Sequence, residues 1–197
     1  MFRSVHRVAA LVVAATFAGA VQGASWDESV QGDLSDNGLA PSTLILDPGH
    51  NVVAGHFGMG RQAGVADLDY LHIVVPAHLR LQGLRLLELV QGGDASFLAI
   101  QAGPQLTLPP NAVDPSPLMG YAHIRPVLAA FGTNLLTAMN VPSTLPAGDY
   151  TFWINETDTS EAWRYALDFE AVAVPELATV WLWLGAGVLL ARRRRVR

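Results

Sequence analysis

The sequence predicts an all-β fold for residues 24–173, an antiparallel β-sandwich of jelly-roll type, within a chain of 197 residues. Three observations support this class. The segment has no long apolar pattern of helical period, it has short runs in which apolar and polar residues alternate, and Gly, Pro, Asn and Asp separate these runs. Such a succession is typical of a sandwich or barrel. The flanking ranges, 1–23 and 174–197, predict an N-terminal signal helix and a C-terminal membrane helix.

Residues 1–23 have the order of a secretory signal peptide. Met1–Arg7 is short and basic, and Val8–Ala20 follows with Thr16 as its only polar member. Val21 and Gly23 then stand at positions −3 and −1 of a plausible cleavage point. The apolar run is shorter than the about 20 residues that a membrane span needs. A buried core helix is the alternative, but such a helix needs neither a basic start nor small residues at its end.

Alternation within the middle segment predicts a series of strands. In chain order they are Asn51–Phe57, Asp69–Val75, Leu79–Leu89, Phe97–Gln101, Tyr150–Ile154 and Trp163–Ala171. The last is the clearest, because its apolar residues point one way while Arg164, Asp168 and Glu170 point the other. The third also has helical spacing, but a strand with a bulge at Gly83 fits its alternation. The polar segment 155–161 joins the last two strands, which predicts a C-terminal hairpin.

Charge and composition exclude several classes of function. The formal net charge of −5 argues against a nucleic-acid partner. Residues 24–173 hold five Arg against sixteen Asp and Glu, a net charge of −11, while the other Arg residues gather at the two ends. The chain contains no Cys, which excludes disulfides, thiol nucleophiles, iron–sulfur clusters and cysteine-based zinc sites.

The C-terminal range has three parts. A short motif consists of Val174, Pro175, Glu176 and Leu177; Val180–Ala191 is apolar; and a basic cluster of Arg192, Arg193, Arg194 and Arg195 follows. Even Leu177–Ala191 gives a helix of only about 22 Å, against a hydrocarbon core of about 30 Å. By the positive-inside rule the Arg cluster stays cytoplasmic and stops transfer. An ordinary single-span anchor would share these features.

This three-part end resembles the PEP-CTERM sorting signal of Gram-negative bacteria that make exopolysaccharide. That signal has a Val-Pro-Glu-Pro motif, a short apolar helix and an Arg-rich end, and Leu177 stands where the family has its second Pro. The resemblance implies processing near the motif by an exosortase, a membrane cysteine transpeptidase. The expected partners are therefore the secretion machinery, signal peptidase, the exosortase and the inner membrane. The expected destination is the cell surface or extracellular matrix.

Several shorter segments resemble the bacterial pre-peptidase C-terminal domain, a small secreted β-sandwich. The matching segments are Asp67-Leu68-Asp69-Tyr70, Val74-Val75-Pro76-Ala77 and Pro146-Ala147-Gly148-Asp149-Tyr150-Thr151, with His78 where that family has Gly. The acidic stretch from Trp26 to Ala40 resembles its polar opening segment. The resemblance implies a sandwich fold, and members of that family bind calcium through comparable acidic segments.

Acidic residues provide the best candidate for a metal site. Asp27, Glu28, Asp33, Asp36 and Asn37 occur within eleven residues, and Asp67 and Asp69 follow just before a predicted strand. Calcium takes six to eight oxygen ligands, drawn from carboxylates and backbone carbonyls on loops. We expect calcium at Asp33, Asp36, Asp67 and Asp69 if the two acidic loops meet. The alternative is that these acids cap helices, form turns and face solvent.

The sequence gives no positive sign of catalysis, and we expect a protein that is not an enzyme. The histidines of the middle segment are His50, His56, His72, His78 and His123, and they do not form a helical zinc motif. No Ser occupies a Gly-x-Ser-x-Gly elbow. A Ser–His–Asp triad assembled from distant residues, and hence a secreted hydrolase, is the alternative that no motif supports.

One aromatic residue suggests a sugar-binding alternative. Trp153 is predicted to lie on the face opposite Tyr150 and Phe152, and an exposed Trp can stack on a sugar. Residues 103–117, with five of the twelve Pro of the chain, predict a long loop of the kind that is often functional. The competing interpretation is a second core face, because aromatic side chains mostly bury.

Together these features predict a non-enzymatic, exported protein of the cell surface or matrix, associated with exopolysaccharide or biofilm and stabilised by calcium. A carbohydrate-binding module for exopolysaccharide, using Trp153 and residues 103–125, is the alternative.

Overall fold

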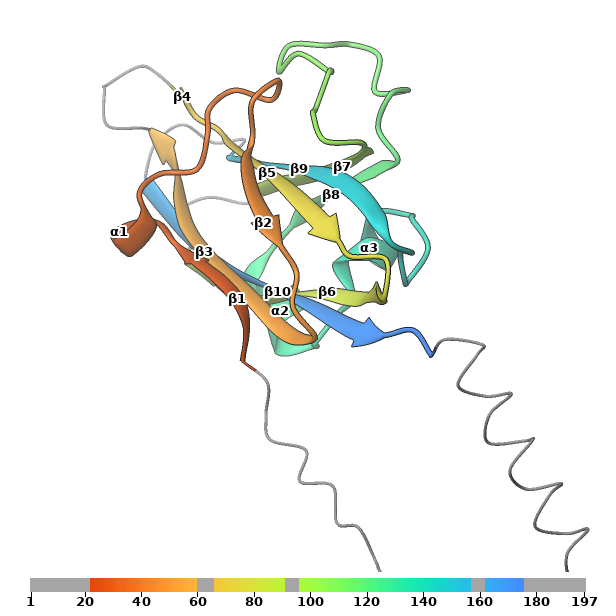
Figure 1. The fold of residues 1–197 in the computed structure, drawn as a ribbon. Coiled ribbons are helices and arrows are strands. Elements are labelled where there is room, and N and C mark those ends of the chain that lie inside the picture. Colours follow the sequence, from red (N-terminus) through yellow and green to blue (C-terminus); the bar gives the residue numbers. More distant parts are fainter. Residues whose placement is uncertain (1–21, 60–65, 91–95, 157–161, 176–197) are drawn as a thin grey trace, which may run out of the picture.

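The computed structural model describes residues 22–59, 66–90, 96–156 and 162–175, which are folded mainly as strands (Figure 1). The predicted all-β class is confirmed. The strands form two five-stranded sheets, called sheet A and sheet B below.

Sheet A has the strand order β1-β3-β10-β6, with β4 beside β3. Its strands are β1 (Gln22–Asp27), β3 (Gly49–Met59), β4 (Ala66–Asp67), β6 (Leu79–Val90) and β10 (Ala162–Ala173). Sheet B has the order β2-β5-β9-β7-β8. Its strands are β2 (Ser42–Ile45), β5 (Asp69–Val75), β7 (Ser96–Ala102), β8 (Gly120–Ile124) and β9 (Gly148–Glu156). The described helices are short: α1 (Glu28–Gln31), α2 (Pro126–Ala130) and α3 (Leu135–Ala138).

Every segment predicted as a strand lies inside a strand of the structure. The ambiguous third segment is the single strand β6, so the helical alternative is wrong. Its pairing with β10 shifts between Leu81 and Gly83, where Gln82 is the additional residue, and the expected irregularity therefore lies beside Gly83. The Pro-rich range 103–117 contains no strand and is the predicted loop.

Not all strand pairs are antiparallel, which corrects one expectation. β1 pairs with β3, and β2 pairs with β5, in parallel. Parallel neighbours need a connection that crosses over. Here the chain supplies it by alternating between sheets: β2 of sheet B lies between β1 and β3 in sequence, and β3 of sheet A lies between β2 and β5.

The predicted C-terminal hairpin is wrong, although both of its strands are present. β9 pairs with β5 and β7 in sheet B, whereas β10 pairs with β3 and β6 in sheet A. Each strand has a strongly apolar face, and these faces meet across the core rather than edge to edge. Phe152 of β9 and Phe169 of β10 show this contact, with ring centroids 5.2 Å apart.

Two apolar clusters stabilise the fold. The main core lies between the sheets and includes Leu71, Ile73 and Leu167, which are fully buried. The second cluster lies on the other side of sheet B, where Leu106 and Leu108 of the Pro-rich loop cover aromatic side chains. Both faces of β5 and β9 are therefore covered. This explains why apolar residues occur on both faces of these strands, whereas a strand with one face in water has them on one face only.

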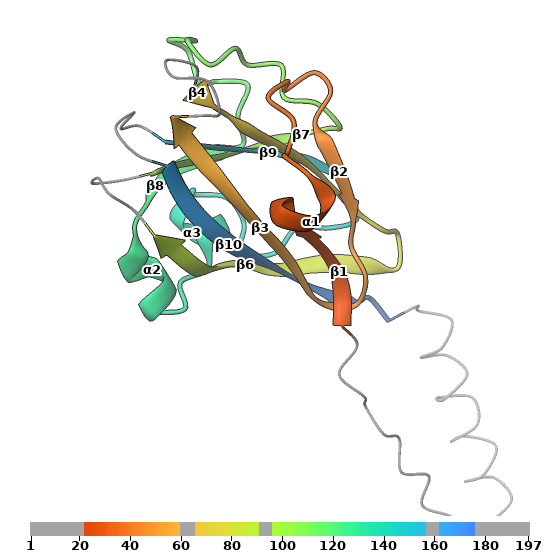
Figure 2. The same cartoon turned by 90° about the vertical axis from the view of Figure 1, so that its left-hand side faces the viewer.

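Both ends of the described domain lie at one pole, which we call the terminal pole. Gln22 of β1 pairs with His50, and Ala171 of β10 pairs with Gly49, so both strands border the start of β3. In Figures 1 and 2 the start of β1 and the end of β10 lie at the lower end of the domain. After β10, the Val174 amide still donates to the His78 carbonyl at 2.9 Å.

Most of the two targeting segments, residues 1–21 and 176–197, lies outside the described residues, and with it Glu176, Leu177 and the Arg cluster. Among the described residues, no helix is long and apolar enough to cross a membrane. β1 begins at Gln22, just before the expected cleavage point after Gly23.

Candidate metal centre

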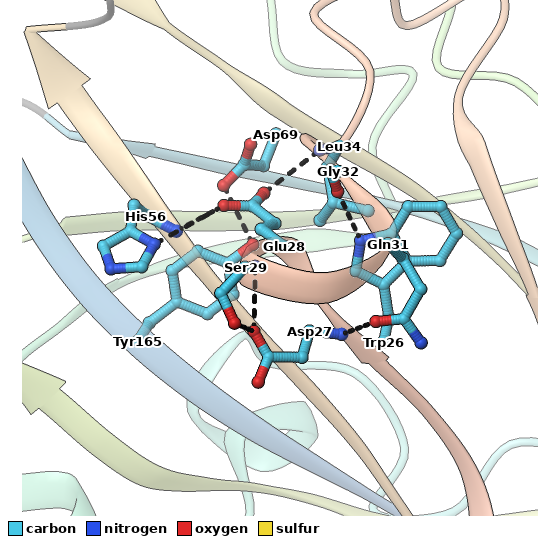
Figure 3. A network of polar contacts seen from close by, with 10 residues as sticks. All are labelled: Trp26, Asp27, Glu28, Ser29, Gln31, Gly32, Leu34, His56, Asp69 and Tyr165. Atoms are coloured by element: carbon cyan, nitrogen blue, oxygen red, sulfur yellow. Dashed lines mark hydrogen bonds and ion pairs between the residues drawn. The ribbon is translucent and has the colours of Figure 1, made fainter.

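A short helical turn directs one carboxylate of the acidic N-terminal segment onto the sheet. Asp27 is the N-cap of α1, where its Oδ1 accepts hydrogen bonds from the amide and the hydroxyl of Ser29. The side chain of Gln31 accepts a hydrogen bond from the Asp27 amide at 2.7 Å. Such capping satisfies amides that a helix start leaves without partners. The turn fixes Glu28 beside β3 (Figure 3).

Glu28 joins three segments through its two carboxylate oxygens. Oε1 accepts a hydrogen bond from the Leu34 amide at 3.1 Å, and Oε2 accepts one from the His56 amide on β3 at 2.7 Å. The imidazole Nδ1 of His56 lies 3.8 Å from the same Oε2. Burial raises the pKa of Glu28, while the two backbone hydrogen bonds act in the opposite direction.

Asp69 is a carboxylate with 0% exposure at the first position of β5. Its Oδ2 accepts a hydrogen bond from the Tyr165 hydroxyl of β10 at 2.8 Å. Its Oδ1 is buried and has no hydrogen-bond partner in the described part of the chain. Burial raises the pKa of Asp69 well above its ordinary value, and the nearby charge of Glu28 raises it further.

Asp33 completes a group of three, which we call the acidic centre: Glu28, Asp33 and Asp69. One carboxylate oxygen from each lies within 4.8 Å of the others. Three negative charges this close repel one another strongly when removed from water. A proton or a cation that compensates part of this charge would therefore stabilise the acidic centre.

The donor set fits a hard cation. It consists of carboxylate oxygens, which calcium and magnesium prefer, rather than the nitrogen and sulfur ligands that favour zinc or copper. Calcium also accepts backbone carbonyls and water in a flexible coordination sphere. The unpartnered Asp69 Oδ1 provides a lone pair that no described donor uses. Glu28, Asp33 and Asp69 are thus the side chains that would hold the ion.

The structure brings together only part of the predicted ligand set. Asp33 and Asp69 meet, as the hypothesis of two converging acidic loops requires. Asp36 is not in the group. Its carboxylate accepts a hydrogen bond from the Leu68 amide at 3.0 Å and so joins the two loops. Asp67 also lies outside it, although its charge contributes to the raised pKa of Asp69. Glu28 was missed as a ligand, and the Asp27 cap that positions it was the available signal.

Trp153 is a core residue of the second apolar cluster. It is 6% exposed, stacks on Tyr70 with ring centroids 6.0 Å apart, and meets Phe97 edge-on at 4.9 Å. This is the second core face of the competing interpretation, and an open stacking surface at Trp153 is not present. The ring nevertheless lines a cavity of about 280 Å³ under the Pro-rich loop, together with Phe97 and Tyr121.

The histidines pair with acids on the strand surfaces. His50 Nδ1 lies 2.8 Å from Asp168 Oδ2. His72 lies between the Thr43 hydroxyl, at 3.2 Å, and Asp149 Oδ1, at 2.8 Å. This row of hydroxyl, imidazole and carboxylate crosses three neighbouring strands of sheet B and fixes the edge strand β2. In the described residues no histidine belongs to a group of three metal-ligating side chains.

Comparison with known proteins adds no relative: no protein-family model, no curated protein and no solved structure matches this chain.

Proposed function

We propose that the chain is a non-enzymatic exported protein that is anchored in the inner membrane and then sorted by an exosortase to the cell surface or matrix. The observation that supports this most directly is the terminal pole. β1 and β10 border the same end of β3, at Gly49 and His50. An N-terminal leader and a C-terminal anchor joined to this pole would enter one membrane from the same side of the domain.

In this proposal the two sheets form a jelly-roll-like sandwich that acts outside the cell, in association with exopolysaccharide. The net charge of −11 in residues 24–173 keeps such a domain soluble at high local concentration. With no Cys in the chain, the domain depends on its core and on bound ions rather than on disulfides.

Mass spectrometry of the mature protein, from envelope and medium fractions, tests the sorting proposal. We expect an N-terminus near Ala24 and a C-terminus near Val174–Leu177. Cleavage after Gly23 would still leave the Ala24 nitrogen beside Asn51 Oδ1, to which it donates at 2.9 Å. An intact Arg192–Arg197 tail on most of the protein would contradict processing.

We further propose that the acidic centre binds calcium and that the ion stabilises the fold. Glu28 comes from α1, Asp33 from the loop that follows, and Asp69 from β5. An ion held by all three would join the N-terminal segment to both sheets. It would also compensate charge that is otherwise buried at a cost of several kcal/mol per uncompensated ion.

Calorimetric titration of the full chain with calcium tests this site. We expect heat of binding for the parent chain, none for Asp69→Asn, and unchanged heat for the matched control Asp114→Asn, since Asp114 is exposed in the Pro-rich loop. Absence of heat with the parent chain would refute the calcium proposal and leave the sorting proposal untouched.

A carbohydrate-binding role is a second candidate, favoured by the cavity beside Trp153. Its lining includes the rings of Phe97, Tyr121 and Trp153, and none of the described residues that line it is charged. Aromatic walls without charge suit the apolar face of a neutral sugar. Glycan-array binding that Tyr121→Ala abolishes would support this role, and no binding to the native polysaccharide would count against it. Tyr121 is half exposed and is the safer substitution, because Trp153 belongs to the core.

A further inference from the structure

The geometry points to the terminal pole as a surface that lies against the lipid headgroups while the chain is anchored. This inference rests on the proposed membrane anchor and goes beyond it, because it states which face of the domain meets the bilayer. The surface consists of the loop that carries Ala77 and His78, the loop that carries Pro146 and Ala147, and Arg80 at the start of β6.

The pole is a single structured surface. The Val174 amide donates to the His78 carbonyl at 2.9 Å, and the Leu81 amide donates to the Leu145 carbonyl at 2.9 Å. These bonds hold the end of β10 and both loops together. Between them is a hollow of about 400 Å³, lined mainly by apolar side chains including Leu79 and Leu145, with Arg80 also in the lining. Ala77, His78, Arg80 and Ala147 are exposed.

The length of the connection forces this surface close to the membrane. Only Pro175 and Glu176 separate Val174, which is bonded to the fold, from the apolar run that begins at Leu177. Three residue steps span at most about 11 Å even when fully extended. The headgroup layer is itself about 5 to 8 Å thick. Even with this connection fully extended, the pole can lie at most about 3 to 6 Å beyond the headgroup layer.

The short apolar run strengthens this constraint. As a helix, Leu177–Ala191 would span about 22 Å, less than the hydrocarbon core of about 30 Å. A short span is accommodated by bilayer thinning or by drawing its flanking residues inward. Either adjustment reduces the distance between the pole and the lipid.

The charge distribution agrees with this orientation. The acidic centre lies toward the other end of β3. Its member Glu28 accepts a hydrogen bond from the His56 amide, and Asp67, two residues before its member Asp69, pairs with Gly58. Near the pole Asp47 and Asp149 are exposed acids, Arg80 is an exposed base, and His50 is paired with Asp168. These acids are fewer than those around the acidic centre, so anionic headgroups meet the less acidic end of a strongly acidic domain.

Single-cysteine labelling tests the orientation in the full chain, which has no cysteine of its own. Ala147→Cys and Ala77→Cys place a fluorophore at the pole. Val113→Cys places it on the Pro-rich loop, where the side chain is 98% exposed. Each variant is reconstituted in phosphatidylethanolamine–phosphatidylglycerol vesicles that contain a headgroup-attached quencher. We expect at least threefold stronger quenching at Ala147 and Ala77 than at Val113.

A longer connection is the matched control. A flexible insertion of twelve Gly and Ser residues after Pro175 has a mean reach of about 20 Å. It should reduce quenching at Ala147 and Ala77 to the level of Val113. Equal quenching at the three positions in the parent chain would overturn the orientation.

Vesicle flotation after a carbonate wash separates this result from failure of the anchor. A chain that leaves the vesicles contradicts the proposed anchor, and the inference falls with it. A chain that stays with the vesicles but shows equal quenching contradicts the inference alone.

Discussion

Asp69 combines complete burial with an oxygen that lacks a hydrogen-bond partner, and this determines how the acidic centre responds to pH. Three acids lie near it: Glu28 from α1, Asp33 from the loop after α1, and Asp67 from β4. From β10 the uncharged hydroxyl of Tyr165 donates a hydrogen bond to it. Burial and the three like charges raise its pKa well above the ordinary value. The folded state without calcium therefore holds protons that the unfolded chain has already lost.

The sign of the pH dependence follows from these raised pKa values. The contribution of Asp69 and Glu28 to stability is fully present below their unfolded pKa, and it is lost as the pH rises through the raised folded pKa. We expect Asp69→Asn to flatten the fall in melting temperature that the parent chain shows in EDTA as the pH rises above the ordinary pKa of a carboxyl group. A variant that keeps the full slope of the parent would contradict this assignment.

Asn51 is a second buried polar residue, and its amide is fully used. Oδ1 accepts hydrogen bonds from the amides of Ala24 and Asp47, both at 2.9 Å, and Nδ2 donates to the Phe169 carbonyl at 2.9 Å. One side chain thus joins β1, the turn before β3, and β10. Replacing this amide leaves the buried Phe169 carbonyl and the partly buried amides of Ala24 and Asp47 without their partner.

We expect Asn51→Ala to lower the free energy of unfolding by about 2 to 4 kcal/mol, because more than one buried group loses its partner. Urea denaturation of the variant measures this change. The exposed Asn111→Ala is the control and should stay within about 0.5 kcal/mol of the parent chain. Equal midpoints for both variants would mean that the Asn51 network contributes nothing.

Strand β3 runs beside the acidic centre. One of its glycines, Gly55, lets the side chains of Glu28 and Tyr165 lie close to the strand. A Cβ at Gly55 would lie 2.6 Å from the Tyr165 hydroxyl and 2.9 Å from the Glu28 carboxylate carbon. The Tyr165 hydroxyl cannot move without disturbing its hydrogen bond to Asp69, and Glu28 cannot move without disturbing the hydrogen bonds from the Leu34 and His56 amides. The sequence offers no sign of this requirement, since Gly in a strand has several possible meanings.

Gly55→Ala should therefore weaken calcium binding at least tenfold and destabilise the fold by about 1 to 3 kcal/mol. Gly83→Ala is a matched control within another long strand. There the new Cβ would lie 3.4 Å from the Asn134 amide nitrogen, a tight contact that a side chain can relieve. Calorimetric affinity and thermal unfolding measure both effects. Equal losses of affinity in the two variants would contradict the role given to Gly55.

The elements themselves were more predictable than their pairing. Alternation located β5, β7 and β10 because each has one strongly apolar face. Alternation does not say which strand lies alongside, and β9 and β10 were wrongly paired for this reason. Four strands were missed, namely β1, β2, β4 and β8, since short strands at the edges of the sheets, such as Ser42–Ile45, carry few alternating residues. The acidic centre was predictable in type. Glu28 as a ligand depends on the turn of α1, and the Asp27 cap was the sign of that turn in the sequence.

Calcium, if bound as proposed, affects the whole domain rather than one loop. The acidic centre joins α1, β5 and, through Tyr165, the central strand β10. A ligand that binds only the folded state stabilises it by about 2.7 kcal/mol at one hundred times its dissociation constant. For a domain of this size the melting temperature should rise by about 5 to 10 °C between EDTA and saturating calcium. An unchanged melting temperature would contradict the stabilising role.

The position of β10 has a mechanical consequence. β10 is paired along its length with β3 on one side and β6 on the other, and its last residues lead directly toward the proposed anchor. If the far end of the domain is pulled by surrounding polymer, the tension runs along the strand axis. The two ladders are then loaded in shear, so that many hydrogen bonds resist together instead of breaking one after another. A domain attached through a central strand is suited to bear load along the axis of that strand.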